Sequence, residues 1–213
     1  IPPGFHYCRF YVDGTTVPLQ VVARAPYDPT IEGGYDLNMP FAVERFDVRA
    51  ELHPLPGLGY RALRVRRGAK PDAGGADILR GPRTLENARL RVDVNANGTL
   101  RLEDKATGRV MDNLCWFEDT AEFGDPWARK TPEGDTPVTS LAATATVTTL
   151  HGGPLEASLR VSLDFDIPAG KTDDGRRSTE TVKLPVTMTV TLKRDAPLAE
   201  VTVHLTNHAR NHR

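Results

Sequence analysis

The residues best suited to chemistry lie in one short stretch, FEDTAEFGDPW, residues 117–127, which we call the acid loop. The loop combines four carboxylates with three aromatic rings: Glu118, Asp119, Glu122, Asp125, Phe117, Phe123 and Trp127. Two carboxyl groups on either side of a glycosidic bond are the usual machinery of sugar hydrolysis. Clustered carboxylates also bind calcium, and many acidic loops simply face water. Three alternatives follow: catalytic acids, a calcium site, or a solvated or interface surface.

Two features of the acid loop weigh against chemistry carried out by the loop alone. A general acid needs a shaped, partly apolar pocket that raises its pKa, and nothing in the sequence specifies one. The spacing of the four carboxylates also differs from that of a calcium-binding loop between helices. We therefore favour a solvated or interface loop.

The six histidines raise the question of a metal site: His6, His53, His151, His204, His208 and His212. The last three are spaced by four residues, which on a helix would place them on one face, as in zinc peptidases. The surrounding sequence VTVHLTN is typical of a strand, however, and no glutamate follows His204 at the required position. We predict a strand followed by a polar turn, and no metal ligands in this chain.

Other signatures of catalysis are missing from the sequence. It contains no glycine-rich phosphate loop, no GxSxG motif and no HExxH motif. Cys8 and Cys115 lie far apart without a CxxC neighbour, which favours reduced thiols and a cytoplasmic protein. The mixed-charge run at 171–180 joins two alternating segments and is predicted to be a hairpin loop. From its own motifs, the chain is not predicted to be a complete enzyme.

The elements that must position the acid loop are nearly all predicted strands. Residues 159–167, 182–192 and 201–205 alternate between apolar and polar side chains, which is the pattern of strands with one buried face. The dipeptides Asp13-Gly14 and Asn97-Gly98 are typical of hairpin turns. Pro185 lacks an N–H, so it indicates an edge or a bulge within its strand. The sequence therefore predicts an all-β fold.

Composition suggests where the chain divides. Its 213 residues suffice for one large β domain or two smaller ones. A stretch rich in glycine, proline and charge precedes the strands of the second half. We predict a small β domain at 1–68, a linker at 69–83 and a larger β region at 84–213. A long surface loop within one domain is the alternative.

The charge balance excludes several partner classes. The 27 basic and 28 acidic residues create no overall field for nucleic acid or an anionic membrane, and no apolar run is long enough to span a bilayer. The segment from Arg61 to Arg91 contains nine basic residues and only three acidic ones. The basic residues form either solvated strand faces or a docking surface for an acidic partner. The first residue is Ile1 rather than methionine, so we expect a piece of a longer protein.

Residues 85–127 resemble the opening of the C-terminal β region of glycoside hydrolase family 38, the α-mannosidases and their bacterial relatives, some of which act on mannosylglycerate. The resemblance rests on the leading LEN, the strand–Asn-Gly–strand hairpin, the turn DKATGR and the acidic stretch that ends in GDPW. Residues 182–213 look like a later part of the same region. The segments VPLQVV and LPGLGYRALRV are similar to the small β domain that precedes it.

The resemblance implies a fold and a division of labour. It implies a small β-sandwich-like domain followed by part of a galactose-mutarotase-like β-supersandwich. Catalysis, with retention, would belong to an N-terminal α/β domain that holds zinc and the aspartate nucleophile. No residue of this chain matches those ligands, so the chain alone is expected to be non-catalytic and free of cofactor. Its partners would be the catalytic domain, the α-mannoside and, through unpaired strand edges, a second copy of the chain.

The same resemblance identifies residues near substrate. The Gly-Asp-x-aromatic element lies towards the catalytic cleft in the family, which makes Gly124, Asp125 and Trp127 substrate-proximal, together with the neighbouring Glu122. Relatives more often carry tyrosine where this chain has Trp127, so the resemblance does not imply a direct hydroxyl contact to the sugar and leaves stacking on an apolar sugar face open. Two other hypotheses stay open. The chain could be a free-standing carbohydrate-binding module, or a purely structural interaction domain.

Overall fold

The computed structural model describes residues 7–31, 39–40, 42–52, 55–125 and 127–213. Apart from one turn of 3-10 helix at Ser140–Ala142 (η1), every regular element in these residues is a strand, which confirms the predicted all-β fold. Two compact units, each described by itself, make up the chain. Unit 1 is Ile1–Ile78 with His151–Ala157, and unit 2 is Leu79–Leu150 with Ser158–Arg213. The predicted boundaries at 68/69 and 83/84 stay a prediction.

Unit 1 consists of three small sheets. The first has the order β2–β1–β7, β3 pairs with β6, and β4 pairs with β5. The predicted Asp13-Gly14 turn joins β1 to β2, and both residues have the positive φ that a two-residue hairpin turn needs, 50° and 81°. The strands are Cys8–Val12 (β1), Thr15–Thr16 (β2), Leu19–Tyr27 (β3), Thr30–Ile31 (β4), Met39–Pro40 (β5), Val43–Ala50 (β6) and Arg64–Arg67 (β7).

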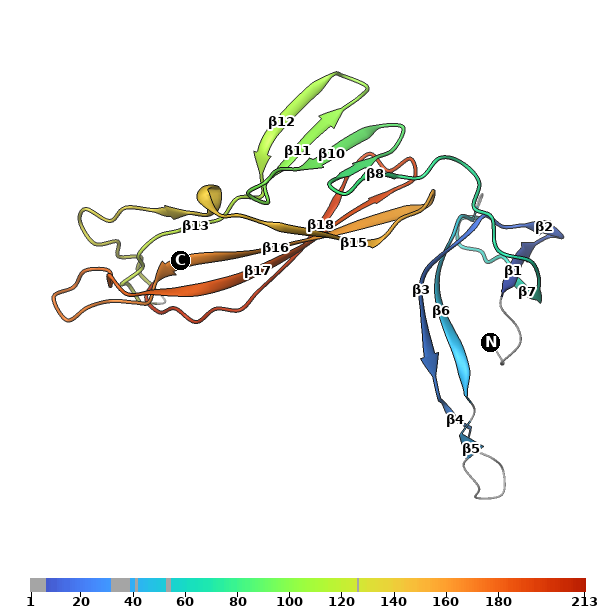
Figure 1. The fold of residues 1–213 in the computed structure, drawn as a ribbon, viewed down its shortest axis with the longest axis horizontal. Helices are drawn as coiled ribbons and strands as arrows, with labels where there is room; N and C mark the ends of the chain where they lie inside the picture. The colour runs from blue at the N-terminus through green and yellow to red at the C-terminus, as the bar shows by residue number, and fades with distance from the viewer. Residues whose placement is uncertain (1–6, 32–38, 41, 53–54, 126) are drawn as a thin grey trace. The chain divides into compact units, whose positions relative to one another are not determined.

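Unit 2 holds a five-stranded sheet of order β12–β11–β10–β9–β8, a four-stranded sheet of order β15–β16–β17–β18, and the short pair β13–β14. Figure 1 shows β16 and β17, in orange and red, as two long neighbouring strands. The strands are Leu79–Gly81 (β8), Thr84–Glu86 (β9), Leu90–Val94 (β10), Leu100–Asp104 (β11), Arg109–Leu114 (β12), Glu118–Asp119 (β13), Val138–Thr139 (β14), Thr146–His151 (β15), Glu156–Pro168 (β16), Thr181–Lys193 (β17) and Glu200–Leu205 (β18).

The core of unit 2 is built on the alternating faces of β16 and β17. Of the side chains predicted to face inward on these strands, Val182 is only half-buried. The others are buried: Leu159, Val161, Leu163, Phe165, Ile167, Leu184, Val186, Met188, Val190 and Leu192. Burial of each such side chain stabilises the fold by about 1.5–3 kcal/mol. Gly98, in the predicted Asn97-Gly98 turn, approaches this core so closely that a Cβ would lie 2.9 Å from Leu163 Cδ2. The hairpin of β10 and β11 therefore rests directly on β16.

The apolar side chains of β18 are less buried than those of β16 and β17, although the strand alternates in the same way. Val203 and Leu205 are opposite the buried Met188 and Val186 of β17, yet they are 42% and 52% exposed. An alternating pattern indicates which face is apolar but not whether another element covers it. Pro185 does not lie on an edge strand, because β17 has β16 on one side and β18 on the other. It lies immediately before the paired register of β17 with β18, near the end of that ladder.

One buried amide ties two turns of unit 2 together. Asn87 donates through Nδ2 to the carbonyls of Lys193, at 2.8 Å, and Ala196, at 3.0 Å. Its Oδ1 accepts from the N–H groups of Arg89 and Leu90 at 2.8 and 2.7 Å. The side chain thus satisfies all its hydrogen-bonding groups while joining the β9–β10 turn to the end of β17.

Candidate functional site

β13 lies near the start of the acid loop. Beyond this strand, the chain folds back on itself as a short irregular hairpin in unit 2. The N–H of Phe123 donates to the carbonyl of Lys130 at 2.8 Å, and the N–H of Asp125 donates to that of Ala128 at 3.1 Å. Gly124 lies inside this hairpin, where a Cβ would meet the Ala128 carbonyl oxygen at 1.9 Å. Only glycine fits this position without a shift of the backbone.

Glu122 and Asp125 hold the hairpin in shape. Glu122 Oε1 accepts from the N–H groups of Gly124 and Lys130 at 3.0 and 2.8 Å. Asp125 Oδ1 accepts from those of Trp127 and Ala128, both at 2.8 Å. These backbone hydrogen bonds, chiefly from Lys130 and from Trp127 respectively, lower the pKa of both carboxyls. Each group is therefore an ionised acceptor at neutral pH, the opposite of what a general acid requires.

Trp127 is the most exposed aromatic side chain near the loop. It is 93% exposed, against 41% for Trp116, and its position is fixed by the N–H bond to Asp125. Phe123 lies further inside, with Lys171 Nζ 5.2 Å from its ring centre. Pro126 lies outside the described residues. The predicted substrate-proximal residues Glu122, Gly124, Asp125 and Trp127 thus share one hairpin, and their contact with substrate stays a prediction.

The adjacent acids of β13 have opposite environments. Glu118 is exposed, whereas Asp119 is buried. Asp119 accepts from Arg177 Nη2 and lies 2.5 Å from His212 Nδ1, while Arg177 Nη1 donates to Asp135 at 3.4 Å. We call Asp119, Asp135, Arg177, His212 and Asn207 the Asp119 cluster. Sequence reasoning identified Asp119 and His212 separately but missed the cluster, because its members come from four distant segments.

The histidines within the described residues do not share one site. His204 and His208 are exposed, His212 belongs to the Asp119 cluster, and His6 and His53 lie outside the described residues. Among the residues that the structure describes, no group of three or more histidine, cysteine, aspartate or glutamate side chains is placed to hold a metal ion.

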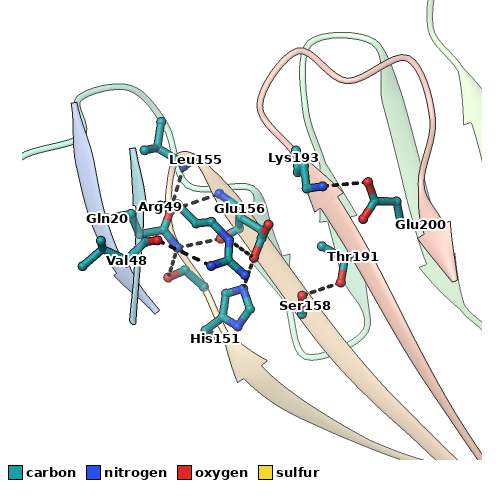
Figure 2. A network of polar contacts seen from close by, with 11 residues as sticks. Gln20, Val48, Arg49, His151, Leu155, Glu156, Ser158, Thr191, Lys193 and Glu200 are labelled. Atoms are coloured by element: carbon teal, nitrogen blue, oxygen red, sulfur yellow. Dashed lines mark hydrogen bonds and ion pairs between the residues drawn. The ribbon is translucent and has the colours of Figure 1, made fainter. Parts of the chain in front are cut away.

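A second polar network lies in unit 1 (Figure 2). Glu156 is 3% exposed, and its Oε1 accepts from Arg49 Nε at 2.9 Å and lies 3.1 Å from His151 Nε2. Gln20 donates to the Glu156 carbonyl at 2.7 Å and accepts from the N–H groups of Leu155 and Glu156 at 2.8 and 3.0 Å. The network fastens the 151–157 turn to β3 and β6 and leaves no free nucleophile or base.

Two further observations limit the chemistry. Cys8 and Cys115 are free thiols, and burial raises the pKa of Cys115, which disfavours the reactive thiolate. Within the described ranges, no helix has the length and apolar character needed to cross a membrane.

Comparison with known proteins places these features in context. The family model described as glycosyl hydrolases family 38 C-terminal domain matches residues 85–212. A protein of Halalkalibacterium halodurans assigned as a mannosylglycerate hydrolase is 24% identical over 221 residues, which cover 93% of this chain and 24% of that protein.

Two solved structures share the fold. An alpha-mannosidase from Enterococcus faecalis V583 superposes with a TM-score of 0.79 at 18% identity, covering 96% of this chain and 25% of its own. A protein in glycosyl hydrolase family 38 from Enterococcus faecalis does so with a TM-score of 0.79 at 20% identity, covering 96% and 26%. The chain therefore spans about a quarter of the length of the relatives it matches.

Proposed function

The chain belongs to the family of glycosyl hydrolase family 38 C-terminal domains, and on this premise we propose that it is the β region of an α-mannosidase-like hydrolase. In this proposal the whole protein cleaves α-mannosidic bonds with retention, and the 213-residue chain alone is not catalytic. The observation that carries the proposal is the family match over residues 85–212, which includes the acid loop.

Catalysis and zinc belong, in this proposal, to an N-terminal catalytic domain of the whole protein. The described residues of this chain do not fit a zinc site, because they lack a cluster of suitable ligands. Glu122 and Asp125 do not fit the role of proton donor either, since backbone N–H groups stabilise their charged forms. The chain's contribution is then binding and shape rather than proton transfer.

The acid loop forms part of the outer wall of the catalytic cleft in this proposal. Asp125 and Glu122 fix the hairpin, Gly124 permits its tight turn, and Trp127 presents its indole face to the substrate. An exposed, amphipathic ring is suited to stacking on the apolar face of a sugar. The 93% exposure of Trp127 supports this role, since its indole is open to contact with a ligand.

Unit 1 offers a surface for docking on the rest of the whole protein. Five large apolar side chains are exposed along one segment: Leu55, Leu58, Tyr60, Leu63 and Val65. Arg64 and Arg66 of β7 are also exposed, which suits an acidic facing surface. The occupant we propose is the catalytic domain, because the relatives are about four times as long as the segment matched here. A Leu58→Asp, Tyr60→Asp pair should make the whole protein more sensitive to limited proteolysis.

Steady-state kinetics of the whole protein test the proposed function. With an α-mannoside substrate, Trp127→Ala is expected to raise KM by roughly tenfold, a typical loss for one stacking contact of about 1 kcal/mol or more. Trp116→Ala, which removes the other exposed indole, is the matched control and should leave KM unchanged. Absence of α-mannosidase activity in the whole protein would refute the proposed function, and an unchanged KM for Trp127→Ala would refute the role of the acid loop.

A carbohydrate-binding module is the second candidate, and the same exposed indole favours it. Calorimetric titration of the isolated chain with mannosides distinguishes the two. Binding by the isolated chain that is lost in Trp127→Ala supports a module, whereas binding only by the whole protein supports a cleft wall.

Compartment and self-association complete the proposal. The free thiols of Cys8 and Cys115 suit the reducing cytoplasm, which fractionation of source cells would test.

The edge strand β18 exposes Val203 and Leu205, so the isolated chain should dimerise through this edge. Sedimentation of the chain and of the whole protein would test that expectation.

A further inference from the structure

The Asp119 cluster is a group of largely buried charged side chains that includes Asp119 of the acid loop. The side chains of Asp119 and Asp135 are each 4% exposed, that of Arg177 11% and that of His212 14%. Arg177 contacts both carboxylates, and its Nη1 also donates to the Asp119 carbonyl at 3.3 Å. Buried carboxylates are costly unless each is paired with a cation or well hydrogen-bonded.

Both ring nitrogens of His212 face acceptors. Nδ1 lies 2.5 Å from Asp119 Oδ1, and Nε2 lies 3.0 Å from Asn207 Oδ1. The Asn207 atom must be the oxygen, because it also accepts from the N–H of Ala209 at 2.9 Å. A neutral imidazole donates from one nitrogen only, so both contacts are satisfied only by the imidazolium.

Charge balance leads to the same protonation state. Two carboxylates with Arg177 alone would leave one uncompensated negative charge in a largely buried site. A positive His212 makes the four ionised side chains neutral overall.

The cluster and the segment that carries His212 are hydrogen-bonded to the backbone just before the hairpin of the acid loop. The N–H of Ala121 donates to Asp135 Oδ2 at 2.8 Å. Thr120 and Arg213 exchange two backbone hydrogen bonds of 2.9 Å, and the N–H of Glu122 donates to the carbonyl of Asn211 at 3.0 Å. The backbone that precedes Gly124 is therefore attached to the segment that carries His212.

We propose that His212 is a positioning residue: as an imidazolium between Asp119 and Asn207, it fixes residues 119–122 and so sets where the hairpin with Trp127 stands. His212 touches no substrate and acts through Asp119. The catalytic part of this inference rests on the proposed function, whereas the charged state of the ring can be measured on the chain alone.

The first experiment is nitrogen NMR of the ring in the 213-residue chain at mildly alkaline pH, with the His212 signal identified by its loss in His212→Gln. Protons on both ring nitrogens are expected for His212. A single ring proton on His212 would overturn the proposal.

The second experiment compares matched variants. His212→Gln should lower the melting temperature by roughly 5–10 °C, as expected when one partner of a buried charge pair is removed. The control His208→Gln should not change it. Asp119→Asn in the His212→Gln background removes the surplus negative charge and should recover part of the loss. Additive effects of the two substitutions would count against a charge pair.

Kinetics of the whole protein separate positioning from general damage. His212→Gln is expected to lower kcat/KM for an α-mannoside by about ten- to a hundredfold, mainly through KM, and His212→Arg should restore part of it. A fall in kcat with KM unchanged would mean loss of folded enzyme and would overturn the positioning role. If the protein with native His212 cleaves no α-mannoside, the proposed function fails, and the NMR result still decides the charged state of the ring.

Discussion

Substitution of Gly124 by alanine is the most direct perturbation of the acid-loop hairpin. The added Cβ would stand 1.9 Å from the Ala128 carbonyl oxygen and 2.8 Å from the Lys130 amide nitrogen. Both neighbours are backbone atoms, which cannot rotate away as a side chain would. The two arms of the hairpin must therefore separate by at least about 1.5 Å to reach ordinary contact distances.

The magnitude follows from the bonds that separation breaks. The hydrogen bonds from Phe123 to Lys130 and from Asp125 to Ala128 cross the hairpin on either side of Gly124. Loss of both bonds costs about 2 kcal/mol at about 1 kcal/mol net each, and this lies within the range of about 1–3 kcal/mol that is typical of an overpacked site. We therefore expect a local destabilisation of about 1–3 kcal/mol. Each 1.4 kcal/mol is a factor of ten, so amide hydrogen exchange within the hairpin should accelerate roughly 5- to 150-fold.

Amide exchange measured residue by residue is the appropriate assay, because the hairpin can open without unfolding of unit 2. Faster exchange is expected at Phe123 and Asp125 in Gly124→Ala. The matched control is Gly81→Ala, since Gly81 also lies in unit 2 but has open space around its Cβ position. Unchanged protection at Phe123 and Asp125 would refute the claim that this position requires glycine.

Three other predictions concern the surroundings of the loop. Asn87→Ala removes four hydrogen bonds and leaves buried backbone groups unpaired, so urea unfolding should report a loss of about 2–4 kcal/mol; a loss well below 1 kcal/mol would contradict the linking role. Because the folded-state pKa values of Glu122 and Asp125 lie below their ordinary values, their contribution is complete above pH ~5 and is lost as the pH falls through those lowered values. The amide resonances bonded to these carboxylates should move over that acidic range, and a flat titration would contradict the assignment. Arg177→Gln should lower the free energy of unfolding by about 3–5 kcal/mol because it removes a cation that pairs with two buried carboxylates. The control Arg176→Gln, at an exposed position, should change it by no more than about 0.5 kcal/mol, and equal effects of the two substitutions would contradict the argument.

Local patterns predicted the strands well because the alternation of apolar and polar side chains is a property of the local sequence. The alternating positions of 159–167 and 184–192 are buried, and the Asp13-Gly14 dipeptide forms the expected turn. In β18 the same pattern was less informative. Val203 and Leu205 are apolar but exposed, since the cover of a face depends on other elements.

The site was only partly predictable. Glu118 and Asp119 are neighbours in sequence, and the alternation of a strand places them on opposite faces without saying which face is covered. The partners of Asp119 are Arg177, which lies 58 residues further along the chain, and His212, which lies 93 residues further along. No short-range spacing encodes such contacts. The tight fit around Gly124 is likewise a property of backbone proximity that residue types alone do not reveal.

The 151–157 turn has a consequence for synthesis on the ribosome. It completes unit 1, and Gln20 bonds to the backbone of residue 156, a separation of 136 positions along the chain. At roughly 5–20 residues per second, translation needs about 7–27 s to cover that distance. For most of this interval β3 and β6 have been synthesised, while the Gln20 amide, which is buried in the folded chain, still lacks the backbone groups of the turn to which it bonds. Unit 1 can therefore finish folding only after much of unit 2 has been synthesised, and chaperone binding to nascent chains should be greatest in this window.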